Sequence, residues 1–374
     1  MLLDLSAAFD TIDHAILLDR LRDRYGFSGT VLRWIKSCLK DRPQCIVLDK
    51  ILPRPRYLSC GVPQWSVLGP LLFALYIAAL EDIISAHGLD AMMYADDTQL
   101  YIFMRKGHRV AALENVSLCL DDIMSWNLHN KLKCNPSKTE IIHFSLRFSP
   151  PEPIALIKVG HHYVQPTSVI ENLGVTLDSH LTFVPHVNNI IRALSRWFHS
   201  IGRIRKYLSQ ADTEHIVLAF VLSKLDYCNS LLHGLPSREI EKLQRLQNTA
   251  ARLTVCTKKT DHITPVLKKL HWLPVSDRIT FKLPLLTYKS LNGLAPVYIN
   301  ELLHHYTPCR SLRSSDSNFL AIRKTATITY GDRSFAAIAP KLWNQLPLAI
   351  RQSDSVDSFK RAMKMYLFRE SFFF

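Results

Sequence analysis

The feature of the sequence most suited to chemistry is a pair of adjacent carboxylates, Asp96-Asp97, between two apolar segments. Adjacent carboxylates repel each other, and placing them beside a hydrophobic sheet costs free energy unless a cation neutralises them. A hard divalent cation such as Mg²⁺ prefers oxygen ligands of this kind. A solvated turn, in which Asp is common, is the alternative, and for the dipeptide alone it is the favoured explanation.

Asp4 is a candidate for a third carboxylate, because it interrupts the apolar run Leu2-Leu3-Asp4-Leu5. Three carboxylates at the ends of neighbouring strands could hold two Mg²⁺ ions about 4 Å apart, which can activate a hydroxyl nucleophile and stabilise a leaving phosphate group. The protein would then supply little besides positioning and charge. A residue that ends a strand and caps a turn is the simpler explanation of Asp4 taken alone.

Apolar patterns predict the elements that would position these carboxylates. Residues 1–5 are predicted as a buried strand, and the apolar runs 92–95 and 100–103 predict a hairpin around Asp96-Asp97-Thr98. Helices are predicted over 12–25, 31–39, 66–86, 110–132, most of 184–273, and 356–367. Further strands are predicted at 44–48, 56–60, 140–144, 154–159 and 169–177, with loops at 146–153 and 307–317. These patterns indicate an α+β fold, with antiparallel strands backed by helices and then a mostly helical region.

Positive charge is concentrated in the later part of the chain. Residues 1–150 contain 17 Lys+Arg and 16 Asp+Glu, whereas residues 151–374 contain 29 and 16. A polyanion, most commonly nucleic acid, is the partner that such a basic region favours. A basic, solvated helical surface with no partner explains the charge equally well.

Other features narrow the class of protein. The eight cysteines form no CxxC pair, which favours free thiols in a reducing compartment, and their spacing to histidines does not match zinc ligation. No signal-peptide pattern opens the chain. The apolar run 67–80 is shorter than the ~20 residues of a membrane-spanning helix. We therefore expect an intracellular protein, cytoplasmic or nuclear, with no membrane partner.

Five segments resemble the ordered motifs of reverse transcriptases. LDLSAAFD (3–10), GVPQWSVLGP (61–70) and YADD (94–97) resemble motifs A, B and C, while NPSKTE (135–140) and NLGVTLD (172–178) resemble motifs D and E. LHWLPV (270–275) and LNGLAP (291–296) resemble the C-terminal region of jockey-like, LINE-type (non-LTR) retrotransposons. The resemblance covers nearly the whole chain.

The resemblance implies a fold and an activity. It predicts a palm at 1–180 (an antiparallel sheet backed by helices), a basic helical thumb-like region at 181–260 and a LINE-type C-terminal extension at 261–374. The implied activity is RNA-directed DNA synthesis on an RNA template and a DNA primer, with dNTP substrates and two Mg²⁺ ions. The implied metal ligands are Asp4, Asp96 and the Leu5 carbonyl, with Asp97 as a further catalytic carboxylate.

The resemblance also assigns roles to residues that have plainer explanations. Phe9 would select dNTP over rNTP, Gln64 would contact nucleotide or template, and Lys138 would lie near the triphosphate; the alternatives are a core aromatic, an exposed amide and a solvated lysine. Gly174 would belong to a primer grip, or else to a bulge. The predicted nucleic-acid contacts are Gly174, Arg192, Arg196, Arg203, Arg205 and Lys206.

Two departures from the family pattern predict weak catalysis. Trp65 stands where the family has the glycine that lets the backbone approach the nascent base pair, and no fingers subdomain precedes residues 3–10, so we expect an N-terminally truncated copy. The alternative function is a catalytically inactive remnant that only binds nucleic acid. A metal-dependent hydrolase is a weaker third possibility, since no His or Glu pairs with the carboxylates to activate water.

Overall fold

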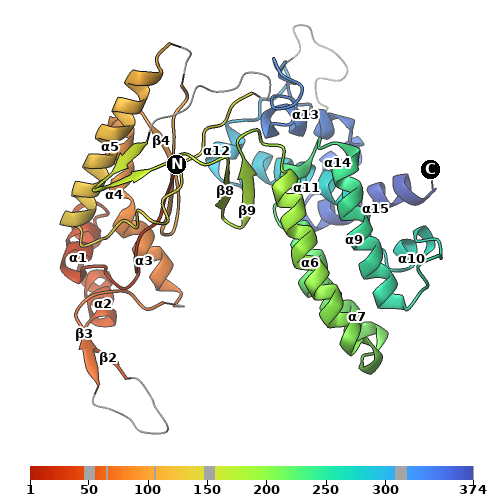
Figure 1. The fold of residues 1–374 in the computed structure, drawn as a ribbon, viewed down its shortest axis with the longest axis horizontal. Coiled ribbons are helices and arrows are strands. Elements are labelled where there is room, and N and C mark those ends of the chain that lie inside the picture. Colours follow the sequence, from red (N-terminus) through yellow and green to blue (C-terminus); the bar gives the residue numbers. More distant parts are fainter. Residues whose placement is uncertain (46–54, 65, 105–106, 147–155, 308–317, 374) are drawn as a thin grey trace. The chain divides into compact units, whose positions relative to one another are not determined.

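The chain folds into two compact units, Met1–Asn172 (unit 1) and Leu173–Phe374 (unit 2) (Figure 1). The computed structural model describes all residues except 46–54, 65, 105–106, 147–155, 308–317 and 374. Helices and small antiparallel sheets are mixed, as the α+β prediction required. The predicted three-part division at 180 and 260 stays a prediction.

Among its described residues, unit 1 contains three of the small sheets, one strand of the fourth, and five helices. Its strands are β1 (Leu2–Leu3), β2 (Arg42–Gln44), β3 (Arg56–Leu58), β4 (Asp90–Tyr94), β5 (Asp97–Tyr101), β6 (Ile157–Val159), β7 (His162–Val164) and β8 (Val169–Asn172). Its helices are α1 (His14–Asp23), α2 (Gly29–Leu39), α3 (Leu68–Ile77), α4 (Ala79–Ala86) and α5 (Arg109–His129). The helices predicted from periodicity in this part of the chain are therefore confirmed.

A three-stranded antiparallel sheet, in the order β1-β5-β4, lies at the centre of unit 1. Leu3 and Leu100 lie on the sheet's buried side, with only 4% and 3% of their surfaces exposed. Helices α3 and α4 contribute Phe73, Tyr76 and Ile84 to the same core, each fully buried. This apolar core fixes which side of β1 and β5 faces inward, and so where the side chains at the strand ends emerge.

Helices α3 and α4 form one apolar stretch, Leu68–Ala86, that is long enough by length and composition to cross a membrane. The expectation that this run is too short is therefore wrong, because the helix extends past Leu80 to Ala86. Core helices of folded domains pass the same test, and the residues that α3 and α4 bury in unit 1 include Leu72 and Leu80.

Unit 2 is mostly helical. It begins with β9 (Val175–Asp178), and its helices are α6 (Val184–Ile204), α7 (Gln210–Val217), α8 (Ser223–Asp226), α9 (Ser237–Val255), α10 (Thr264–Lys269), α11 (Val275–Leu291), α12 (Val297–Asn300), α13 (Phe335–Gln345), α14 (Leu348–Arg351) and α15 (Val356–Phe373). Short 3₁₀ or π turns occupy Arg205–Tyr207, Leu218–Leu222 and Asn229–Leu232. The helical pattern predicted for 184–273 and 356–367 is confirmed.

Three strand predictions differ from the structure. Residues 140–144 form only isolated bridges, Leu2 with Glu140 and Ile142 with Thr167. The predicted strand 169–177 is divided into β8 and β9 by a turn at Leu173-Gly174, where both residues have positive φ. The hairpin turn lies at Ala95-Asp96, so Asp97 is the first residue of β5. The predicted loops 146–153 and 307–317 lie almost wholly outside the described residues.

Candidate active site

The register of the central sheet brings Asp4 beside Asp97. Leu2 pairs with Gln99 and Leu3 with Thr98, so continuing the antiparallel register by one residue sets Asp4 opposite Asp97. Tyr94 pairs with Asp97 across the hairpin, with Ala95 at φ +52° in the two-residue turn. Residues more than ninety positions apart in the chain are thus neighbours at one end of the sheet.

A polar cavity of about 400 Å³ opens at this end of the sheet. Three of its lining residues, Asp4, Asp97 and Lys138, are predicted site residues. Lys138 Nζ lies 3.5 Å from Asp4 Oδ2. The lysine side chain is 67% exposed, so water screens this ion pair and it contributes little to stability.

The neighbouring carboxylates destabilise the charged form of Asp97. Partial burial raises the pKa of Asp97 above its usual value of 3.8, and the charges of Asp96 and Asp4 raise it further. Lys138 lowers the pKa of Asp97, but this effect is smaller than the others. Negative charge at this end of the sheet is therefore incompletely compensated by the protein, which is the electrostatic condition for binding a cation.

One carboxylate oxygen at this end of the sheet lacks a partner that a cation could supply. Asp4 Oδ2 is buried and has no hydrogen-bond partner among the described residues, because Lys138 lies within ion-pair range but outside hydrogen-bonding geometry. A cation would satisfy this oxygen. Within the described part of the chain, however, no three His, Cys, Asp or Glu side chains are gathered as a complete ligand set. The convergence of all three carboxylates on metal stays a prediction.

The segment that carries Lys138 is hydrogen-bonded to the outer edge of β1. The Asn135 N–H donates to the Asp4 carbonyl at 2.8 Å, and Leu2 and Glu140 exchange backbone hydrogen bonds of 2.7 and 3.0 Å. The turn between them is closed by Ser137 Oγ, which donates to Asn135 Oδ1. This pairing holds Lys138 over the carboxylates.

Leu5 and Phe9 lie in the chain that follows Asp4. Leu5 is 6% exposed and forms an isolated antiparallel bridge with Cys134. The ring of Phe9 stacks on Phe73 with centroids 4.7 Å apart and remains half-buried against the core. Phe9 thus contacts the core directly, and its role in sugar selection stays a prediction, as does the metal contact of the Leu5 carbonyl.

The segment 61–64 packs against the end of motif A. Gln64 is exposed and its Nε2 donates to Asp10 Oδ1 at 2.9 Å. The Gly61 N–H donates to the Ile12 carbonyl at 2.8 Å, and Gly61 has φ +83°. A Cβ at Gly61 would lie 2.9 Å from the Asp10 carbonyl oxygen, so this close approach requires glycine. Trp65, the next residue after Gln64, lies outside the described residues.

The predicted nucleic-acid contacts of unit 2 differ in whether their side chains are exposed or bonded within the protein. Arg192, Arg196, Arg203 and Lys206 are exposed. Arg205 instead donates to the carbonyl oxygens of Leu208, Leu253 and Thr254, which commits its guanidinium to the main chain.

Gly174, the remaining predicted nucleic-acid contact, has φ +76° in the turn after Leu173. Two successive residues with positive φ are typical of a tight turn, and this turn explains the glycine without a bulge. The role of Gly174 in gripping a primer stays a prediction.

Sequence reasoning missed two acidic side chains that also line the polar cavity, Glu140 and Glu171. Glu140, two residues after Lys138 in the chain, faces the cavity because it pairs with Leu2. Glu171 lies on β8. The next residue of β8, Asn172, exchanges side-chain hydrogen bonds with Gln99 of β5. Only the alternation of side chains along a paired strand could have indicated either residue.

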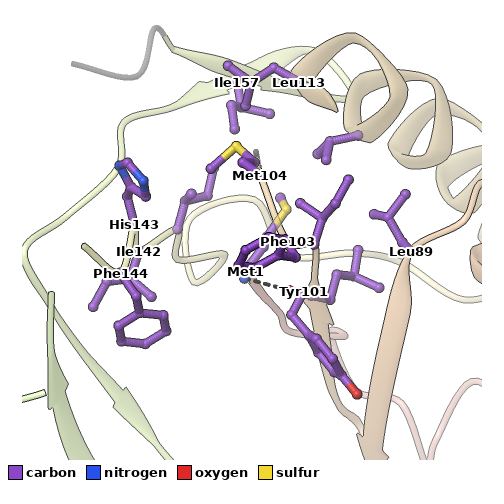
Figure 2. A pocket seen from close by; sticks show the side chains of 14 residues that line it. Met1, Leu89, Tyr101, Phe103, Met104, Leu113, Ile142, His143, Phe144 and Ile157 are labelled. Carbon is purple, nitrogen blue, oxygen red and sulfur yellow. Dashed lines mark hydrogen bonds between the residues drawn. The ribbon is translucent and has the colours of Figure 1, made fainter. Parts of the chain in front are cut away.

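A second cavity in unit 1, of about 450 Å³, is apolar (Figure 2). Its lining includes Met1, Tyr101, Phe103 and Phe144, and none of its described lining residues is acidic. It offers one imidazole, that of His143, but no carboxylate oxygen of the kind that Mg²⁺ takes as a ligand, so the polar cavity beside Asp4 is the candidate active site.

Residues 1–177 match the model of the family described as reverse transcriptase (RNA-dependent DNA polymerase). The chain is 28% identical to a probable RNA-directed DNA polymerase from transposon BS of Drosophila melanogaster, over 68% of this chain and 28% of that protein. It is 28% identical to the RNA-directed DNA polymerase from mobile element jockey of the same organism, over 51% of this chain and 21% of that protein. The chain spans less than a third of the length of these curated relatives.

The family match assigns residues 1–177 to the reverse transcriptases. Together with the relatives, it supports the narrower resemblance that the motifs predicted, to the reverse transcriptases of LINE-type (non-LTR) retrotransposons. This family uses divalent metal ions and binds nucleic acid and nucleotides.

Replacing Gly61 by alanine should destabilise unit 1 by about 3 kcal/mol, because the positive φ costs ~1–2 kcal/mol and the clash with the Asp10 carbonyl adds to it. Gly88→Ala is the matched control: φ is +66° there, and a Cβ would meet nothing within 4 Å. We expect it to cost only about 1 kcal/mol in urea denaturation. Equal losses for both variants would contradict the close approach at Gly61.

Asp97→Asn should raise the melting temperature at pH 7. The raised pKa of Asp97 means that the folded state binds a proton more tightly than the unfolded state, so the charged carboxylate lowers stability above its folded pKa. The gain should shrink as the pH falls towards 3.8, where the carboxyl becomes protonated in both states. Thermal melts between about pH 4 and 7 measure the difference in melting temperature between the variant and the unmodified chain. Asp90→Asn, at an exposed position, is the control. A lower melting temperature for Asp97→Asn at pH 7 would contradict the prediction.

Proposed function

We propose that the chain is the polymerase portion of a retrotransposon enzyme, which extends a primer 3′-end with dNTPs on an RNA template by a two-metal mechanism. The observation that carries the proposal is the register of β1 on β5, which sets Asp4 beside Asp97 in the polar cavity. The names of the relatives, each an RNA-directed DNA polymerase, support the same activity.

The proposed site uses side chains of the cavity, together with Asp96 of the adjacent hairpin turn, in distinct roles. Asp4 and Asp96, with the Leu5 carbonyl, would hold the two metal ions, and Asp97 would add negative charge that attracts them. Bound Mg²⁺ would lower the pKa of the primer hydroxyl and stabilise the charge that develops on the leaving pyrophosphate. Lys138, 3.5 Å from Asp4 and largely exposed, is free to turn towards the triphosphate of an incoming nucleotide.

The segment 61–64 and Phe9 supply the nucleotide-binding side of the proposal. The hydrogen bond from Gln64 to Asp10 holds the amide next to the end of motif A. Phe9, stacked on Phe73, gives a rigid aromatic surface that a 2′-hydroxyl would meet. Trp65 replaces the family's glycine directly after Gln64, so we propose that synthesis by this chain is impaired.

Primer extension on an RNA template with Mg²⁺ tests the proposal. The unmodified chain should extend a labelled DNA primer slowly, and Trp65→Gly should extend it faster. Asp4→Asn and Asp96→Asn should each lower extension on the order of 100-fold or more, because each removes charge that stabilises the transition state. Asp90→Asn, on β4 but exposed and outside the polar cavity, should leave the rate unchanged.

If Asp96→Asn still extends primers at the rate of the unmodified chain, the proposed metal-binding role of the carboxylates is wrong. A chain that is inert even as Trp65→Gly, yet retains nucleic acid in filter binding, would favour the alternative of an inactive remnant that only binds nucleic acid. Thermal melts with Mg²⁺ measure metal binding separately from activity. Mg²⁺ should raise the melting temperature of the unmodified chain more than that of Asp97→Asn.

A further inference from the structure

Two amide side chains link the central strand of unit 1 to the strand that leads into the predicted primer grip. Gln99 Nε2 donates to Asn172 Oδ1 at 2.9 Å, and Asn172 Nδ2 donates to Gln99 Oε1 at 3.1 Å. β5 and β8 belong to different sheets, so side chains make this link and strand pairing does not. Each amide gives one donor and one acceptor to the other, which fixes their mutual orientation better than a single hydrogen bond would.

Gln99 is held in register with the candidate active site. β5 is the middle strand of its sheet, and Gln99 pairs with a residue of β1 on one side and of β4 on the other. Alternate residues of a strand point to the same face, so Gln99 shares with Asp97 the face opposite to the buried Thr98. Two residues of a strand span about 7 Å. The amide pair therefore ties Asn172 to a position beside the candidate active site.

Asn172 is the residue directly before the turn that is predicted to grip a primer. Leu173 and Gly174 form this turn with φ of +46° and +76°. The Leu173 carbonyl oxygen accepts a hydrogen bond from the Tyr227 hydroxyl at 2.6 Å. A two-residue turn has little freedom once the residue before it and its first carbonyl are both hydrogen-bonded. The link to Gln99 thus sets where the turn begins.

The amide pair adds little to the stability of the fold. Both side chains are only partly buried, so water would satisfy the two amides if they separated. What the pair restricts is position, because it prevents the end of β8 from shifting along β5. Such a restriction is useful where a reacting group has to be placed accurately.

We propose that Gln99 and Asn172 are positioning residues, whose reciprocal hydrogen bonds fix the Leu173-Gly174 turn, and with it a primer 3′-end, relative to Asp97. This role rests on the proposed polymerase function and adds to it two residues that do not line the polar cavity. Reacting atoms have to approach to about 3–3.5 Å, and a misplacement of about 1 Å lowers a rate on the order of 100-fold. The pair therefore acts on the rate of synthesis and not on the affinity for dNTP.

Photo-crosslinking tests the position of the primer without requiring synthesis. A DNA primer with 4-thiothymidine at its 3′-end, annealed to an RNA template, is irradiated with the full chain, and mass spectrometry identifies the cross-linked peptide. In the unmodified chain we expect cross-links in the peptide that contains Leu173 and Gly174. Gln99→Met and Asn172→Leu keep the approximate shape of each side chain without its hydrogen bonds. Each should lower the yield about fivefold, while filter binding of primer–template changes less than about twofold.

Exchange of the two amides is the matched control. Gln99→Asn combined with Asn172→Gln keeps the summed length of the two side chains and their donors and acceptors, so the yield should return to within about twofold of the unmodified chain. Gln99→Met combined with Asn172→Leu should lose no more than either single variant, because residues that act as one pair are not additive. Gln352→Met, at an exposed position that ends α14, should leave the yield unchanged.

The kinetics of primer extension give a second measurement. At saturating primer–template, Gln99→Met should lower the maximal rate about tenfold and leave the KM for dNTP within about twofold, because the nucleotide side of the site is unchanged. The exchanged pair should recover this rate, which a general loss of stability would not predict. Circular dichroism melts establish that each variant is folded at the assay temperature.

Three results would overturn the positioning role. They are an unmodified chain without cross-links in the peptide that contains Leu173 and Gly174, an exchanged pair that stays as low as the single variants, and losses that multiply in the double variant. A chain that cross-links as expected but extends no primer would contradict the proposed polymerase and still support the positioning of the primer by the amide pair.

Discussion

The pairing of the two-residue strand β1 with β5 is the constraint on which the candidate active site depends. It places Asp4 and Asp97 on neighbouring strands, where like charges directly opposite each other are destabilising. The compensation is apolar, because the same pairing buries Leu3 and Leu100, which are 4% and 3% exposed. The free energy of core burial therefore holds together two carboxylates that would otherwise separate.

β1 is short, yet it is fixed on both sides. Beyond β5, its other edge is hydrogen-bonded to the segment that carries Lys138, through Asn135 and Glu140. Both edges of β1 are therefore hydrogen-bonded. The same hydrogen bonds fix the position of the segment that carries Lys138. Ala95, at φ +52° directly before Asp96, is a non-glycine residue in a costly conformation, and such strain is tolerated where the surrounding pairing determines the turn.

Local periodicity was sufficient to predict most of the helices, because their apolar stripes repeat over many residues. It missed α11 and α13, each of which contains a proline, Pro284 and Pro340. It could not predict that residues 140–144 pair only through isolated bridges, since bridge formation depends on a partner far away in the chain. The proximity of Asp4 and Asp97 was predicted from the ordered motifs, whereas Glu140 and Glu171 were missed because a single acidic residue has no local pattern. Arg205 has the sequence context of a surface cation, and only the end of α9 explains why its guanidinium is committed to carbonyl oxygens.

The uneven distribution of charge along the chain agrees with the proposed roles of an acidic cavity in unit 1 and of exposed cations in unit 2. A cavity lined by Asp4, Asp97, Glu140 and Glu171 repels phosphates until cations occupy it, so it cannot supply the first attraction for nucleic acid. That attraction has to come from cations elsewhere, and residues 151–374 carry 29 of the 46 Lys+Arg. Some of these, such as Arg205 and Arg278, are committed to partners within the fold, whereas others, such as Arg192 and Arg196, are exposed. The proposed polymerase therefore requires positive charge outside its acidic cavity.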